Sequence, residues 1–243
     1  FCILLSAEKE LECKLNFLKN MKSFTFILYM IYALLSCNAK QTQDSTQAIM
    51  DNQKLIKAVV NNDTTFVVSA LKLGANVNAT DDENRSLLLI ATNHYYFEMA
   101  KILVQHGADV NQQANNMDSV FLYTGATGQT ELLKLFIANG ARFDIFNRYN
   151  GSALIPACER GHVETVRLLA NTKDFPINHI NRLGWTGLME AVILGDGSVK
   201  YQQIVQILKD AGADLHIPDH DGVTPLQHAE RRGFDEIVKI IKS

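Results

Sequence analysis

The sequence predicts an all-α protein, a solenoid of about six helix-turn-helix repeats with short β-hairpin loops. Two recurrences predict this fold. A Gly-Ala pair recurs with a period of 33 residues at Gly74, Gly107 and Gly140, and it returns at Gly212. A six-residue segment beginning with Ser or Thr recurs with spacings of 33, 33, 34 and 38 residues. Its copies begin at Ser86, Ser119, Ser152, Thr186 and Thr224.

The composition is that of an ordinary globular protein. Of 243 residues, 47% are hydrophobic and 20% are charged, which excludes wholesale disorder and collagen-like repetition. The net charge of −3 lacks the basic excess of a nucleic-acid-binding protein. Four cysteines are too few for a disulfide-built scaffold.

Each recurring segment has the residues needed to start a helix and to pack it. Its Ser or Thr is expected to cap an inner helix by accepting a backbone hydrogen bond, and Pro225 suits the first helical position. A small residue further on lets two antiparallel helices approach closely. The residues at this position are Ala58, Ala91, Thr124, Ala157, Ala191 and Ala229.

Glycines and turn residues mark the ends of the helices. We expect Gly128, Gly161, Gly195 and Gly233 to end inner helices in the left-handed conformation. An outer helix with paired apolar residues follows each of them. Asn-Gly at 150–151 and Asp-Gly at 221–222 are typical of hairpin turns between repeats.

Two departures from the pattern are expected to have structural effects. Pro156 lies inside the fourth inner helix, where it should bend the helix or cost a hydrogen bond. The fifth repeat carries about five extra residues around 196–203, which should lengthen the loop between its two helices.

The segment Thr224-Pro225-Leu226-Gln227-His228-Ala229 resembles the T-P-L-H-x-A motif of the ankyrin-repeat family. The resemblance covers residues 51–243 and implies that stacked repeats build the core together. It further implies a non-catalytic protein that binds a partner through hairpin tips and the concave side of the inner helices. The approximate repeats are 51–80, 81–113, 114–147, 148–180, 181–218 and 219–243.

Mapping the family's binding positions onto this chain yields a cluster rich in Arg and aromatic residues, which are enriched at binding hot spots. The alternative is a solvated polar face. We expect a protein partner, a monomeric chain, no cofactor and no nucleic acid. The predicted partner-binding residues are Arg148, Tyr149, Arg160, Arg182, Trp185, His220, Arg231 and Arg232.

The N-terminal segment has the pattern of a secretory leader. Residues 1–20 are interpreted as an upstream extension of the reading frame or, alternatively, as a genuine leader. Residues 21–36 form the predicted signal peptide, because Lys22 precedes a twelve-residue apolar run over 24–35. That run is shorter than a membrane span, and a buried core helix is the alternative interpretation.

Leu34-Leu35-Ser36-Cys37 resembles a bacterial lipobox, which implies acylation of Cys37 after cleavage. Two or more lipid chains would anchor the protein to a bacterial membrane. The alternative is ordinary cleavage after Ala39, which would release an exported protein. Residues 37–50 are expected to form a flexible tether, and the predicted location is the periplasm.

No catalytic or metal-binding residues are predicted. His216, His220 and His228 with Asp219 form the best metal candidate, but a hairpin with an interrupting proline is the simpler interpretation. Cys158 occupies a core position of the repeat, so we expect packing rather than nucleophilic chemistry.

The sequence therefore predicts an exported, membrane-tethered protein-interaction module. Two alternatives remain open. One is an accessory protein of an exported enzyme such as a catalase, because the sequence resembles bacterial periplasmic ankyrin proteins, some of which are associated with catalase and oxidative-stress protection. The other is a hydrolase or metal enzyme that uses the histidines.

Overall fold

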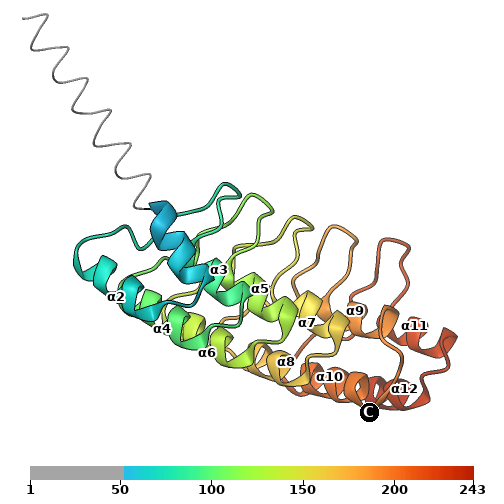
Figure 1. The fold of residues 1–243 in the computed structure, drawn as a ribbon. Coiled ribbons are helices and arrows are strands. Elements are labelled where there is room, and N and C mark those ends of the chain that lie inside the picture. Colours follow the sequence, from blue (N-terminus) through green and yellow to red (C-terminus); the bar gives the residue numbers. More distant parts are fainter. Residues whose placement is uncertain (1–51) are drawn as a thin grey trace, which may run out of the picture. The chain divides into compact units, whose positions relative to one another are not determined.

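The computed structural model describes residues 52–243. The helices lie in two rows, and each inner helix packs against its outer partner and against neighbouring inner helices (Figure 1). The inner row contains residues 52–60, α3 (Leu87–Asn93), α5 (Val120–Thr127), α7 (Leu154–Arg160), α9 (Gly187–Ile193) and α11 (Pro225–Arg231). The outer row contains α2 (Thr64–Lys72), α4 (Phe97–Gln105), α6 (Thr130–Ala138), α8 (Val163–Ala170), α10 (Val199–Asp210) and α12 (Asp235–Lys242).

The predicted all-α solenoid is confirmed. In residues 52–243, strand pairing is limited to one isolated bridge between Thr80 and Ser86. Within the same part of the chain, every helix is too short or too polar to cross a bilayer. The predicted extension (1–20), signal peptide (21–36), acylated Cys37 and tether (37–50) lie outside the described residues.

Stacked repeats build the core. Ala91, Ala157, Ala191 and Ala229 have no exposed surface, which agrees with their predicted role in letting the helices approach closely. Larger side chains such as Phe121 fill the space between successive helix pairs. Because each pair buries its apolar face against its neighbours, no repeat has a core of its own.

Four of the recurring Ser and Thr residues cap inner helices as predicted. The side-chain oxygens of Ser86, Ser119, Thr186 and Thr224 each accept a hydrogen bond from the backbone N–H three residues on. These bonds satisfy N–H groups that a helix start leaves without a partner.

The inner helix α7 departs from this pattern because of Pro156. In each of the four capped helices, the residue four positions after the cap donates its backbone N–H to the carbonyl of the capping residue. Glu190 N, for example, donates to Thr186 O at 3.0 Å. Pro156 occupies that place in α7 and has no N–H to donate. Helix α7 begins only at Leu154, and Ser152 Oγ is buried without a hydrogen-bond partner. Pro156 therefore costs a hydrogen bond, as the sequence predicts.

The predicted helix-ending glycines are confirmed at three positions and wrong at one. Gly128, Gly161 and Gly233 have φ values of 71°, 76° and 68°, in the left-handed region. Gly195 does not adopt this conformation; Gly197 does, with a φ of 73°. The fifth-repeat insertion moves the turn, because five residues link α9 to α10 whereas two link α7 to α8.

The insertion also lengthens a helix, which the sequence analysis did not predict. Helix α10 has 12 residues and α8 has 8. The extra residues are thus divided between the loop and the start of the outer helix.

Asparagine side chains link successive repeats at the bases of the loops. The Oδ1 atoms of Asn78 and Asn111 accept hydrogen bonds from the backbone N–H of Asp109 and Arg142, both at 2.8 Å. Asn111 Nδ2 also donates to Gly140 O at 3.0 Å. These bonds hold one repeat in register with the next.

Replacing Asn111 with alanine should destabilise the fold, because it removes both hydrogen bonds to the following repeat. We expect a loss of about 1 kcal/mol in the free energy of unfolding, measured by urea denaturation. Asn115→Ala is the matched control, because Asn115 is exposed and only its backbone N–H takes part in a hydrogen bond, to Glu83 O. Equal stabilities of the two variants would contradict this account.

Candidate binding groove

The hairpin tips that precede the inner helices are locally braced. Asp81, Asn147, Asn181 and Asp219 each accept two backbone hydrogen bonds through one side-chain oxygen, from the residues two and four positions on. A residue with positive φ completes each of these four tips, namely Asn84, Asn150, Gly184 and Gly222. In the tip before α5, Ala114 stands at the bracing position and Met117 has the positive φ. The tips are therefore formed before any partner binds.

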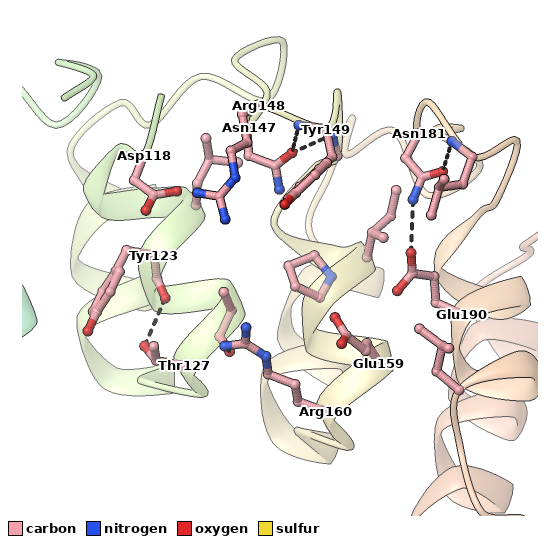
Figure 2. A pocket seen from close by; sticks show the side chains of 17 residues that line it. Asp118, Tyr123, Thr127, Asn147, Arg148, Tyr149, Glu159, Arg160, Asn181 and Glu190 are labelled. Carbon is pink, nitrogen blue, oxygen red and sulfur yellow. Dashed lines mark hydrogen bonds between the residues drawn. The ribbon is translucent and has the colours of Figure 1, made fainter. Parts of the chain in front are cut away.

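A groove of about 340 Å³ crosses three repeats on the face of α5, α7 and α9 (Figure 2). Hairpin tips form one edge, and the helices form the floor. The side chains that give the groove its chemical character are Asp118, Tyr123, Arg148, Tyr149, Glu159, Arg160, Leu183, Glu190 and Leu194.

Three of the lining residues occupy the same place in successive repeats. Tyr123, Pro156 and Glu190 each lie four residues after the Ser or Thr that starts the repeat motif. Tyr123 and Glu190 are not among the residues predicted to bind a partner. Comparing this one position across the aligned repeats would have identified the row.

One end of the groove combines two arginines with a carboxylate. Arg160 Nη1 donates to Ala126 O at 2.8 Å, and the Arg148 guanidinium lies 4.8 Å from the centre of the Tyr149 ring. Burial raises the pKa of Asp118, and the positive charges of Arg148 and Arg160 partly oppose this effect. The positive charges at this end are therefore partly balanced within the chain.

The other end contains two carboxylates, from α7 and α9. Glu190 is only 5% exposed, and its Oε1 accepts a hydrogen bond from Asn181 Nδ2 at 2.9 Å. Burial and the nearby negative charge of Glu159 raise the pKa of Glu190 to about 7. This end therefore exchanges a proton near neutral pH.

Three of the predicted partner-binding residues line the groove: Arg148, Tyr149 and Arg160. Arg182 and Trp185 lie at the next tip and do not line it. Arg182 is exposed and Trp185 is half-buried.

The other three predicted residues lie around the last repeats, outside the groove lining. Arg232 Nη2 donates to Gly195 O at 2.8 Å, and its guanidinium lies 4.8 Å from the Phe234 ring centre. His220 lies against Gly184, and Arg231 is exposed. The structure thus separates the predicted cluster, and the binding role of these residues stays a prediction.

The candidate reactive residues have structural contacts. Cys158 has no exposed surface, and burial raises the pKa of its thiol, which disfavours the nucleophilic thiolate. His228 Nε2 lies 2.7 Å from Asp219 Oδ2. Among residues 52–243, no three His, Cys, Asp or Glu side chains gather as a metal site would require.

Comparison with known proteins identifies ankyrin repeats over most of this part of the chain. The family model for ankyrin repeats (3 copies) matches residues 55–147 and 121–219. A putative ankyrin repeat protein of Escherichia coli, YahD, is 34% identical over 179 residues, which cover 74% of this chain and 89% of the relative.

Two solved ankyrin repeat structures are similar to this chain in both fold and sequence. An ankyrin repeat domain from Acinetobacter baumannii has a TM-score of 0.76 and 44% identity, and the match covers 78% of this chain and 96% of that domain. The ankyrin repeat protein EF0377 has a TM-score of 0.75 and 39% identity, with the same coverage.

Replacing Glu190 with glutamine should stabilise the fold at alkaline pH. Since the pKa of Glu190 in the folded state is about 7, above its usual 4.5, ionisation costs stability as the pH rises from 4.5 through 7. The glutamine side chain of this variant cannot ionise but can still accept the hydrogen bond from Asn181. We expect similar urea stabilities at pH 4.5 and a gain of about 1–2 kcal/mol for E190Q at pH 8, less than the full shift because water reaches the groove.

Glu164→Gln is the matched control, because Glu164 is exposed on the outer helix α8. A gain of the same size at both pH values, or the same gain in the control, would contradict the buried, proton-exchanging state of Glu190.

Proposed function

Since the chain belongs to the ankyrin-repeat family, we propose that it is a non-catalytic module that binds a partner protein. Ankyrin repeats generally mediate protein–protein interaction. We propose that the partner binds in the groove over α5, α7 and α9. The observation that carries the proposal is that three successive repeats contribute to one groove. Its exposed rim contains Arg148, Tyr149 and Arg160.

The rim has the properties of a binding hot spot. Tyr149 is 55% exposed and lies beside the Arg148 guanidinium. Asn147 braces the tip that carries both residues by accepting hydrogen bonds from the N–H groups of Tyr149 and Gly151, each at 2.9 Å. Because the tip is already ordered, it loses less conformational entropy when a partner binds. Tyr and Arg are also residue types that often anchor interfaces.

We further propose that the module is exported and held at a bacterial membrane by an acylated Cys37. Support comes from the sequence alone: an apolar run over 24–35, a preceding Lys22 and the lipobox-like Leu34-Leu35-Ser36-Cys37. Two or more acyl chains would suffice for stable attachment. The accessory role beside an exported catalase stays a prediction.

Partner capture tests the groove. The chain carrying a C-terminal tag is purified from its native host, and co-purified proteins are quantified by mass spectrometry. We expect the double variant R148A/Y149A to retain less than a tenth of the partner captured by wild type, because hot-spot residues contribute about 2 kcal/mol or more. Its melting temperature should be unchanged, since both side chains are exposed.

Arg167→Ala on the outer helix α8 is the control, because it removes an exposed arginine away from the groove. The variants R182A and W185A test the next tip. Full partner capture by R148A/Y149A would show that the groove is not the binding surface. If R182A and W185A also capture the partner fully, the next hairpin tip is not the binding surface either.

The N-terminus of the same purified chain tests the anchor. Mass spectrometry should find a mature protein that begins at a diacylglyceryl-modified Cys37, and C37A should remove this modification and release the protein from the membrane fraction. An unprocessed chain in the cytosolic fraction would refute export and tethering together.

A further inference from the structure

Glu190 is the only charged side chain among the buried residues of the part of the chain that the structure describes. Buried carboxylates are normally paired with a cation, because a charge removed from water is unfavourable without one. Glu190 forms no ion pair with any described residue, and its single side-chain hydrogen bond there is the one that Asn181 Nδ2 donates to Oε1. Its second oxygen, Oε2, forms no hydrogen bond with a described residue and is not among the fully enclosed atoms without a partner, so it is open to the groove.

The next repeat shows that a carboxylate without an ion pair is not needed to link the hairpin tip to the inner helix. His228 occupies the position equivalent to Glu190, and Asp219 the position equivalent to Asn181. There the tip carboxylate is paired with the histidine ring at 2.7 Å. In the fifth repeat the tip offers a neutral amide instead, for which a glutamine would be an equally good acceptor. The link between tip and helix therefore does not explain the negative charge of Glu190.

Glu159 adds a second negative charge to the same end of the groove. Figure 2 shows Glu159 and Glu190 together on α7 and α9, with Asp118 at the opposite end. Arg160, which also lines the groove, donates to Ala126 O. The groove lining also includes the apolar side chains of Leu183 and Leu194. A groove that offers apolar side chains and two carboxylates matches the methylene stem and the charged head of a long basic side chain.

We propose that the end of the groove between Glu159 and Glu190 binds a lysine or arginine side chain of the partner protein. This inference rests on the proposed function, because it requires that the partner enters the groove. A metal ion is a poorer fit, since no third ligand gathers there among the described residues. An anionic group would be repelled by both carboxylates.

Binding of a cation here is coupled to proton release. Among groups on the helices packed against α9, Glu159 and Cys158 of α7 interact electrostatically with Glu190. Tyr201 of α10 donates to the backbone O of Glu159, and His228 of α11 is paired within its own repeat. Near pH 7 Glu190 holds a proton part of the time, and an incoming cation displaces that proton to solvent.

The experiment selects random linear peptides displayed on phage against the full chain and sequences the enriched pool. We expect one position of the enriched peptides to be Lys or Arg. The tightest binder is then synthesised with that residue and with a neutral counterpart, acetyl-lysine or citrulline. Against wild type, the neutral peptide should bind at least tenfold more weakly. Against E159Q/E190Q, the two peptides should bind equally weakly.

Calorimetry supplies an independent readout. At pH 6.5, wild type should release protons on binding the basic peptide, seen as different heats in phosphate and imidazole buffers, and E190Q should not. Glu164→Gln on α8 is the matched control and should behave as wild type. E190Q keeps its acceptor for Asn181, so it is expected to fold.

Several results would overturn the cation site: an enriched pool without a basic position, no enriched peptide at all, or equal affinity of the basic peptide for wild type and E159Q/E190Q. If wild type self-associates and E190Q does not, the basic side chain comes from a second copy of the chain. That result would overturn the assignment to a partner protein. If R148A/Y149A loses the native partner while E159Q/E190Q retains it, the cation site fails and the proposed function stands. If both variants retain the partner, both fail.

Discussion

The structure depends on the inability of a single repeat to bury its own apolar face. The inner and outer helices of one repeat contact each other and those of the next, and the small residues at Ala91, Ala157 and Ala191 set how closely they approach. The asparagine bonds from Asn78 and Asn111 keep the loops in the same register as the helices. The groove is a product of this stacking, because its lining comes from three repeats and no single repeat contains it.

The repeat architecture was predictable because its causes are local. Capping residues such as Ser86 and Thr186, and left-handed glycines such as Gly128, act within a few residues of themselves, so a period in the sequence becomes a period in space. The prediction failed at Gly195 for the converse reason. Once the insertion had changed the length of the loop, the position in the repeat no longer determined which glycine adopts the left-handed conformation.

The candidate site was predictable only in part. Arg148, Tyr149 and Arg160 followed from aligning the repeats, since tips and inner-helix faces are surface positions in every copy. Aligning the repeats also places Glu190 in the row with Tyr123 and Pro156, but it does not predict that Glu190 is buried. A lone Glu on a short helix is usually solvated, and the burial of Glu190 comes from contacts between the fifth-repeat tip and α9. Neither the distance to Asn181 nor the closeness of Glu159 can be derived from a repeat pattern.

Tyr123, Pro156 and Glu190 form a row along the groove, with one residue from each of three successive repeats. Packed helices lie about 8–10 Å apart, so each step along the row covers about that distance. An extended polypeptide advances about 3.3 Å per residue. A partner segment that ran along the row in an extended conformation would therefore pass about three of its residues for every repeat of this chain. Its contacts with the tyrosine, the proline and the carboxylate would then fall at every third side chain, which is the period of a polyproline II segment and not that of an alternating strand.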